Sequence, residues 1–527
     1  MTELTGLGTL TRFLLRRDRV RILVWIAAIG LLIVLSAASV EGIYPTQADL
    51  DEAATASRDN AAAIAFNGPD QALDTLGGQV AFQVSSFGLI LTGLMAIFMV
   101  GRETRGEEES GRLELLRSLP VGRHAATTAV LLVAAGMSVA VGAVITLGML
   151  AIGLPGGGSL ALGAGFTAVG LVFTGITLVA AQVTENTRVT YGISGAVLGA
   201  AFALRAAGDV GDGTLTWLSP IGWAQKMRPY AGERWWPLLL ILVTTALLVA
   251  GAVLLTAHRD VGAGLVPPRP GPARAAPALG RPLGLAVRMQ RGSVVAWASG
   301  LLLMGVAYGS VAQDVDDFVG DNQSVEDVIA RSGGASLTDS YLATSLLMLA
   351  MVGSGFTIAA VLRLRSEETN LRAEPVLATR VSRPRWVASH LAASVVGSAV
   401  VMVVAGLGVG VSYGLAADDL GQVTRMVGAS LAYVPAMWLL AGVALLLFGA
   451  VPRAVGAAWA VLAGCFVVGL LGEVFGFPDW VQGLSPFDHI PEMPAEGLSV
   501  VPVLAVTAVA VALAAGGVVA FGRRDIG

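Results

Sequence analysis

Two short segments of the chain carry the same charged pattern, R-x-E-E-x-x-x-R-x-E, each just after a long apolar run. Their residues are Arg105, Glu107, Glu108, Arg112 and Glu114 in the first copy, and Arg365, Glu367, Glu368, Arg372 and Glu374 in the second. On a helix, Glu108 and Arg112 would pair in the favourable order, worth about 0.2–0.5 kcal/mol, and Arg105 would share their face. The pattern predicts two equivalent surfaces for docking a soluble partner. The alternative is two solvated loops that only flank the apolar runs.

No other group of residues has the spacing of a catalytic or metal site. Asp488, His489 and Glu492 lie close in sequence, but four scattered histidines do not give ligand spacing. Cys465 is the single cysteine, so the chain can form neither an internal disulfide nor a cysteine-based metal site. A P-loop ends in G-K-[ST], and the one lysine, Lys226, follows Gln225. We therefore expect no catalytic residue, metal or cofactor here; if ATP drives the protein, ATP and Mg bind another chain.

The composition is that of a membrane protein. The 527 residues are 55% hydrophobic and only 13% charged, with a mean hydropathy of +0.74. Soluble domains carry about 25% charged residues. The chain lacks a Lys/Arg-rich block with interleaved aromatic residues, so we do not expect nucleic acid as a partner.

Twelve apolar runs are long enough to cross a bilayer, which takes about 20 residues in a helix. They predict an all-α integral membrane protein with twelve transmembrane helices. The runs lie near 22–40, 80–101, 125–152, 159–182, 190–207, 236–256, 294–312, 341–362, 387–415, 426–450, 455–474 and 499–521.

The arginines predict the orientation. They concentrate in alternate loops, for example over 12–21, 102–123 and 363–385, whereas aspartate and glutamate fill the opposite loops. By the positive-inside rule the arginine side is cytoplasmic, and both termini lie on it. The loop 208–235 is an exception, because it carries Lys226, Arg228 and Arg234 on the outer side. Its aromatic residues predict a segment in the outer membrane interface, where basic side chains reach lipid phosphates.

Repeated motifs predict that the chain consists of two parallel repeats of six spans each. Further landmarks recur with the same spacing: Arg16, Arg19 and Trp25 as Arg288, Arg291 and Trp297, and Leu218-Ser219-Pro220 as Leu484-Ser485-Pro486. The predicted domains are a first half over 1–260, a Pro/Arg-rich cytoplasmic linker with an interfacial helix over 261–292, and a second half over 293–527. Leucines and arginines over 7–19 predict an interfacial helix before the first span, and 283–291 would form its counterpart.

A family resemblance rests on the end of the first charged segment and the residues directly after it: Gly111-Arg112-Leu113-Glu114-Leu115-Leu116 and Leu119-Pro120-Val121-Gly122-Arg123. This sequence resembles the cytoplasmic coupling segment of type-2 ABC exporter permeases. The fused twelve-span arrangement resembles their polyketide-antibiotic, or tetronasin-resistance, branch. The resemblance implies a plasma (inner) membrane permease that moves bulky apolar compounds outwards, driven by two copies of a separate cytoplasmic ABC ATPase. It assigns ATPase coupling to the charged residues of both segments.

The second copy departs from the pattern. Pro375 stands where the first copy has Leu115, and Arg380 replaces Pro120. A proline inside a helix interrupts it. The departure predicts a broken helix and a weaker docking surface in the second half.

The resemblance also places the second and fifth spans of each half at a seam between the halves, where a substrate cavity is expected. Aromatic and methionine walls suit bulky, varied apolar ligands, because methionine adapts its shape. Ordinary helix packing is the alternative for any one of these residues. The candidates are Phe82, Ser86, Phe87, Met95, Phe98, Met348, Met351 and Phe356.

Other functions stay open at this level. An ion-driven secondary multidrug transporter would use a relay of ionisable residues through the membrane. Arg205, Glu473 and His390 instead lie near predicted span ends, where long polar side chains reach the interface, so the sequence favours an ATP-driven system. An ABC exporter of lipids and a non-transporting scaffold or lipid-processing protein are the remaining alternatives.

Overall fold

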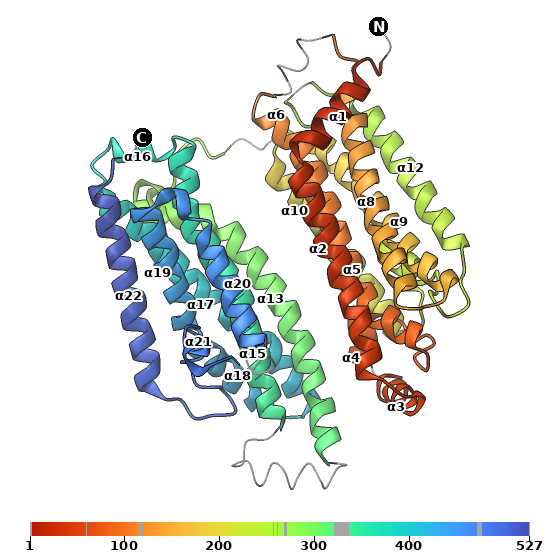
Figure 1. Cartoon of the computed structure of the whole chain (residues 1–527). Helices are drawn as coiled ribbons and strands as arrows, with labels where there is room; N and C mark the ends of the chain where they lie inside the picture. Colours follow the sequence, from red (N-terminus) through yellow and green to blue (C-terminus); the bar gives the residue numbers. More distant parts are fainter. Residues whose placement is uncertain are drawn as a thin grey trace. The chain divides into compact units, whose positions relative to one another are not determined.

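The computed structural model describes residues 3–58, 61–112, 114, 118, 120–256, 258–260, 262–267, 271–320, 337–471 and 477–525. The chain divides into two compact units, Met1–Gly271 and Pro272–Gly527, and the division falls inside the predicted linker. All regular elements in the described residues are helical, which confirms the predicted all-α class (Figure 1).

The first unit is a bundle of long helices with short helices at both ends (Figure 1). Its elements are α1 (Leu7–Arg17), α2 (Arg19–Ile43), α3 (Gln47–Ser57), α4 (Ala61–Asn67), α5 (Leu76–Gly101), η1 (Arg102–Gly106), α6 (Glu107–Glu109), α8 (Ala125–Ala151), α9 (Gly156–Val183), α10 (Thr187–Val210), η2 (Leu215–Leu218), α11 (Pro220–Gln225) and α12 (Trp236–Thr256).

The second unit is also a bundle of long helices joined by shorter ones. Its elements are η3 (Pro277–Gly280), α13 (Pro282–Gly320), α15 (Leu337–Thr369), α16 (Ala373–Leu377), α17 (Arg383–Ala416), α18 (Gly421–Ala432), α19 (Val434–Ala450), η4 (Pro452–Ala454), α20 (Ala457–Leu471), α21 (Asp479–Gln482) and α22 (Val500–Arg523).

Eleven helical stretches among the described residues are long and apolar enough to cross a membrane. Each coincides with one of the twelve predicted runs, and α18 and α19 together form one stretch, over 421–450. The remaining run, 455–474, corresponds to α20, whose apolar part is shorter than a full span. The chain is therefore a multi-pass membrane protein, whereas twelve crossings and the orientation of the termini stay predictions.

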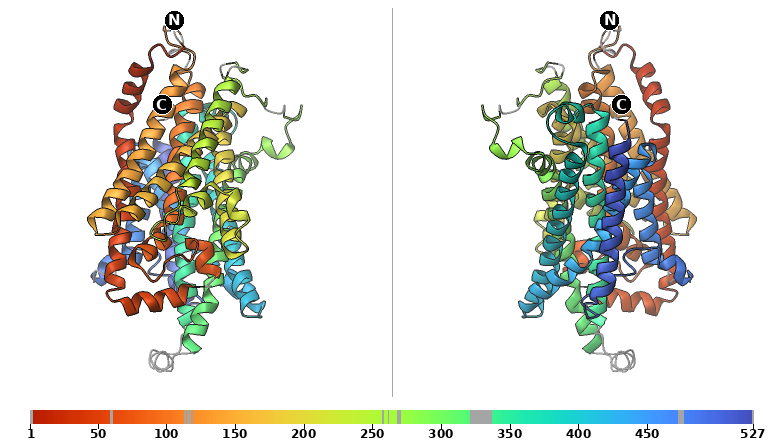
Figure 2. Two further views of the ribbon diagram at one scale, coloured as in Figure 1. Left: turned by 90° about the vertical axis from the view of Figure 1, so that its right-hand side faces the viewer. Right: turned by 90° about the vertical axis from the view of Figure 1, so that its left-hand side faces the viewer.

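The predicted interfacial helices have different outcomes. In the first unit, α1 is a separate helix that ends at Arg17, and Asp18 alone separates it from α2. It buries Leu10 and Leu14 and exposes most of its arginines, as an amphipathic helix does. The counterpart over 283–291 is not a separate helix, because these residues form the beginning of α13, and its position at the interface stays a prediction. Figure 2 shows the long helices of the chain from two further sides.

Close backbone packing positions the long helices of each unit. In the first unit, α5 and α9 are the most buried spans, and α8 lies against α9. Gly142 and Gly163 face each other there, and a Cβ on either would clash with the carbonyl of the other. In the second unit, Gly305 of α13 and Gly408 of α17 approach each other's helix backbone in the same way. Small residues allow such contacts between apolar helices in a bilayer, where no hydrophobic force drives them together.

Candidate functional site

The first charged segment begins as a continuation of α5. η1 is a π-helical turn and α6 is one short turn, after which Gly111 adopts a φ of +71° and ends the helix. Glycine takes this left-handed conformation without steric cost. Because Arg112 lies beyond this stop, the predicted helical pair of Glu108 and Arg112 does not form, and the predicted common face with Arg105 is wrong. Arg112 instead approaches Glu107, with 3.4 Å between Nη1 and Oε1.

The second segment has the same stop at the equivalent residue. Leu371 adopts a φ of +57° directly after α15, and its N–H donates to the carbonyl of Glu368, as that of Gly111 donates to Glu108. A new helix, α16, then starts at Ala373, so Pro375 lies in its first turn, where a proline removes no helical hydrogen bond. The predicted interruption by Pro375 is wrong, because both copies break four residues earlier.

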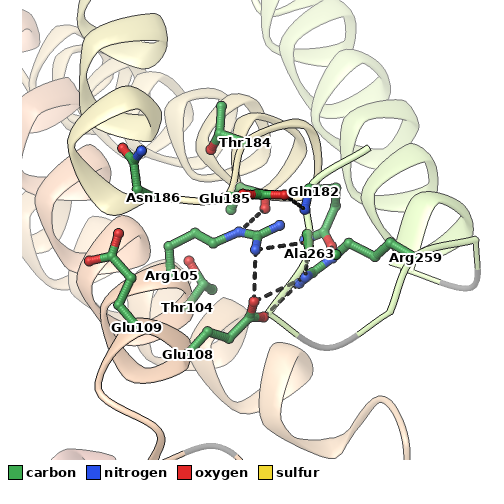
Figure 3. A network of polar contacts seen from close by, with 12 residues as sticks. Thr104, Arg105, Glu108, Glu109, Gln182, Thr184, Glu185, Asn186, Arg259 and Ala263 are labelled. Carbon is green, nitrogen blue, oxygen red and sulfur yellow. Dashed lines mark hydrogen bonds and ion pairs between the residues drawn. The ribbon is translucent and has the colours of Figure 1, made fainter. Parts of the chain in front are cut away.

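Glu108 binds two arginines of the first unit (Figure 3). Arg105, whose side chain is 0% exposed, donates from Nη1 to Glu108 Oε2 at 2.8 Å. Arg259 donates from Nη2 to Glu108 Oε1 at 2.6 Å. Both arginines also donate to backbone or side-chain oxygens of neighbouring segments: Arg105 to the carbonyls of Ala181 and Ala263, and Arg259 to Gln182 Oε1 and the carbonyl of Ala263. The segment is thereby tied to the end of α9 and to the chain that follows α12.

Glu368 binds two arginines of the second unit with the same atoms. Arg365 Nη1 lies 3.1 Å from Glu368 Oε2, and Arg524 Nη2 lies 2.6 Å from Glu368 Oε1. Arg524 directly follows α22, the last long helix of its unit, as Arg259 follows α12. We refer to Arg105, Glu108 and Arg259 as the first triad, and to Arg365, Glu368 and Arg524 as the second triad. Each triad connects the charged segment to the last span of the same unit.

Sequence reasoning did not find the third member of either triad. Arg259 and Arg524 lie more than 150 residues from their glutamates, outside the repeated pattern. A usable signal was present, because each follows the sixth apolar run of its half. Two arginines at matching places after the last span of each repeat could have been paired with the two matching glutamates.

A second ion network surrounds the first triad's segment. Arg17, at the end of α1, pairs with Glu103 and, at 3.2 Å, with Glu107, and Arg102 Nη1 lies 2.6 Å from Asp18 Oδ1. Burial alone would lower the pKa of Arg17, but the carboxylates of Asp18, Glu103 and Glu107 outweigh it and hold the pKa above its usual value. This network fixes α1 against the base of α5.

The repeated residues therefore divide into a buried and an exposed set. Arg105, Glu107, Glu108, Glu367 and Glu368 have almost fully buried side chains that face their own unit. Beyond the helix stop, the side chains of Arg112 and Arg372 are each 63% exposed, and Glu114 and Glu374 are exposed as well. This second set, together with Arg365, whose side chain is 36% exposed, can present charge to another protein.

Comparison with known proteins decides the family. The family model described as "Multidrug efflux system permease Rv1217c, C-terminal domain" matches residues 7–255 and 279–522. The multidrug efflux system permease protein Rv1217c of Mycobacterium tuberculosis (strain ATCC 25618 / H37Rv) is 44% identical over 525 residues, covering 99% of this chain and 95% of that protein. The chain belongs to this permease family. The unmatched stretch between the two matched parts contains the linker at which the permease divides into its two units.

The Pro-Val-Gly-Arg sequence after the first segment contacts the N-terminal segment of the permease. The N–H groups of Gly122 and His124 donate to the carbonyls of Thr5 and Glu3, at 2.9 and 3.1 Å. A Cβ on Gly122 would clash with the carbonyl of Glu3. The equivalent residue of the second copy is Ser382, which begins α17 as its N-cap. The glycine therefore serves the contact with the N-terminal segment.

We expect Gly122→Ala to loosen this N-terminal contact, because overpacking of this kind costs about 1–3 kcal/mol. Amide exchange at His124 and over α1 should accelerate by about tenfold or more, measured by hydrogen–deuterium exchange of the whole chain. Gly136→Ala, at an open position of α8, is the matched control. Equal exchange in the two variants would contradict the role assigned to Gly122.

The predicted cavity residues do not gather at one place within either unit. Phe82 lines a space of about 20 Å³, Ser86 donates to the carbonyl of Asn67, and Met95 and Phe356 belong to the cores of their units. Phe87 and Phe98 are exposed on the first unit and Met348 is half-buried in the second. Met351 lines a larger cavity, of about 180 Å³, in the second unit. The predicted seam between the halves stays a prediction.

Proposed function

We propose that this permease is the membrane subunit of an ATP-driven ABC exporter in the plasma membrane. In this proposal two copies of a separate cytoplasmic ATPase drive it, and it moves bulky apolar compounds out of the cell. The single observation that carries the proposal is the duplicated triad, which holds a charged segment at one end of each unit and leaves Arg112 and Arg372 exposed beyond it. Two such segments match two ATPase chains.

The triads supply a physical route for coupling. A partner that contacts the exposed residues moves the segment that carries Glu108, and Glu108 is bound to Arg259 at the end of α12. Glu368 is bound in the same way to Arg524 at the end of α22. Buried charge pairs resist separation, since an uncompensated charge is costly away from water. In the proposed mechanism, displacement of the segment therefore shifts the last span of the same unit.

The energy source belongs on another chain in this proposal. The single lysine, Lys226, follows Gln225 and precedes Met227, so the sequence lacks the G-K-[ST] ending of a P-loop. ATP and Mg would then bind the partner ATPase, and the permease would hydrolyse no ATP. The name of the Mycobacterium relative, a multidrug efflux system permease, supports drug-like compounds as the substrates. The cavity around Met351 combines apolar walls with a few polar groups, as sites for such ligands do.

We expect the double variant Arg112→Glu/Glu114→Arg to weaken binding of the cognate ATPase chain by about tenfold, because it reverses charges at the rim of the proposed interface. Binding of the purified ATPase to the reconstituted permease measures the effect. Glu108 is unsuited to this test, since its side chain is buried inside the unit. Arg372→Glu/Glu374→Arg tests the second segment separately and shows whether the two surfaces are equal.

Arg16→Glu is the matched control, because Arg16 is an exposed arginine of the neighbouring α1 outside the repeated pattern. Wild-type ATPase affinity in both double variants would refute the docking assignment. Efflux in vesicles that persists without ATP and stops with an ionophore would support the ion-driven transporter instead. ATP hydrolysis by the purified permease alone would also contradict the proposal.

A further inference from the structure

Three basic residues of the first unit meet at a cavity far from the triad. The cavity has a volume of about 160 Å³ and is lined by Gln71, Trp217, Lys226, Arg228, Arg234 and Trp236. These are the three basic residues of the loop 208–235, the loop that departs from the positive-inside pattern of the sequence. Because they line one cavity, we look for an interaction at this cavity that explains why basic residues lie in a predicted outer loop.

The loop between α11 and α12 brings these side chains together. Arg228 and Tyr230 both have left-handed backbones, with φ of 56° and 60°, and the N–H of Arg234 donates to the carbonyl of Met227 at 2.8 Å. The chain thus turns back on itself, so that Arg228 and Arg234 reach the same cavity. A left-handed backbone costs free energy for residues other than glycine and is retained where the surroundings enforce it.

The protein neutralises the charge in this cavity only in part, because Asp209 attracts Lys226 from beyond ion-pair distance. In the part of the chain that the structure describes, no carboxylate lies within 4.0 Å of the side chains of Lys226, Arg228 or Arg234. The Nε of Arg228 is buried and has no hydrogen-bond partner there. Like charges held close together repel each other, and a buried donor without a partner is destabilising. An anion in the cavity would remove both costs.

The length of α12 sets the depth of the cavity in the membrane. Trp236, which lines the cavity, is the first residue of α12, and Arg259 of the first triad follows its other end. At about 1.5 Å per residue, the 21 residues of α12 extend about 32 Å. The hydrocarbon core of a bilayer is about 30 Å thick. The cavity therefore lies at headgroup level, at the membrane interface opposite the first triad.

The surroundings of the cavity favour a lipid over a free anion. Trp217 and Trp236 stack with ring centroids 5.0 Å apart, and both rings are partly exposed. Leu215 and Leu218, beside Trp217, are exposed as well. Tryptophan prefers the headgroup region, and exposed leucines next to it suit acyl chains. An anion with an apolar tail would satisfy both the basic cavity and its apolar border.

We propose that this cavity binds the phosphate of an anionic phospholipid headgroup, in the leaflet opposite the first triad. Lys226, Arg228 and Arg234 donate to the phosphate oxygens, and Trp217 and Trp236 contact the glycerol backbone and the beginning of the acyl chains. Arginine and lysine are the common partners of phosphate in proteins. The site is independent of ATPase docking, which the proposal assigns to the other end of the unit.

The test titrates the full-length chain, purified in a neutral detergent, with three probes, and counts bound lipid by native mass spectrometry. The probes are dioctanoyl phosphatidylglycerol, dioctanoyl phosphatidylcholine and sodium phosphate. We expect phosphatidylglycerol to bind at least about tenfold more tightly than phosphatidylcholine. Each cation replaced by glutamine should weaken phosphatidylglycerol binding by about fivefold, from about 1 kcal/mol per basic residue near a lipid surface.

Two variants keep the test independent of folding defects. Lys226→Gln/Arg234→Gln leaves the left-handed Arg228 in place, and the triple variant adds Arg228→Gln. The matched control, Arg12→Gln/Arg16→Gln/Arg19→Gln, removes three exposed charges at the other end of the same unit. Equal affinity for the two lipids, or wild-type phosphatidylglycerol binding in the triple variant, would overturn the proposal. Saturation by sodium phosphate at the same concentration would overturn the assignment to a lipid.

Discussion

Replacing Glu108 by leucine is expected to destabilise the first unit by about 3–5 kcal/mol, the usual cost of removing one partner from a buried ion pair. The change leaves two guanidinium groups without their carboxylate: Arg105, whose side chain is 0% exposed, and Arg259, at 8%. Arg105 is held away from water, because its Nε and Nη1 donate to the carbonyls of Ala181 and Ala263 and its Nη2 is buried without a partner in the described residues. Unfolding of the reconstituted permease in mixed micelles, followed by helicity, measures the loss.

The second triad provides the internal comparison. Glu368→Leu should cost only about 1–3 kcal/mol, because Arg365 is 36% exposed and Arg524 is 17% exposed, so both retain access to water or lipid headgroups. Glu114→Leu, at an exposed position of the first charged segment, should change the free energy of unfolding by less than about 0.5 kcal/mol. A Glu108 variant as stable as the Glu114 variant would show that the first triad does not hold its unit together.

The spans were predictable because apolar length is a local property of the sequence. Every predicted run coincides with a helix, and α1 follows from the alternation of leucine and arginine over 7–19. The charged segments were recognisable for the same reason, since repeated spacing is visible without a structure. Their geometry was not, because it depends on where the helix stops. Gly111 offered a signal for that stop in the first copy, but Leu371 takes a left-handed conformation that its residue type does not favour.

Contacts between distant segments account for the remaining differences. Nothing near Glu108 in the sequence indicates Arg259, which reaches it through the packing of α12 against α9. His390 was assigned to a span end from which it would reach the interface, yet it is buried with its ring 5.5 Å from that of Trp386. Glu473, assigned in the same way, lies outside the described residues. Burial of a polar residue depends on which neighbour covers it, and that neighbour need not be close in sequence.

Arg205 shows the largest difference between the predicted and the observed position of a polar side chain. Its replacement by leucine should destabilise the first unit by about 3–5 kcal/mol. The sequence suggested a side chain that reaches the interface, but Arg205 is fully buried. Its Nη1 lies 3.7 Å from Asp209 Oδ2, and it donates to the carbonyls of Ile64 and Phe66 near the end of α4. Leucine would leave the buried carboxylate of Asp209 without its counter-charge and the carbonyl of Phe66 without the donor from Arg205.

A double-mutant cycle separates these contributions. Asp209→Leu alone leaves Arg205 buried without its counter-charge, and Arg205→Leu/Asp209→Leu removes both charges. The double variant should cost less than the sum of the single variants by about 0.5–3 kcal/mol, yet stay less stable than wild type because the hydrogen bonds from Arg205 to the carbonyls of Ile64 and Phe66 are lost. Arg188→Leu, at the exposed beginning of α10, is the control and should be nearly neutral. Strict additivity would mean that the two charges do not interact. A cost at Arg205 no greater than at Arg188 would mean that α4 is not held by this arginine.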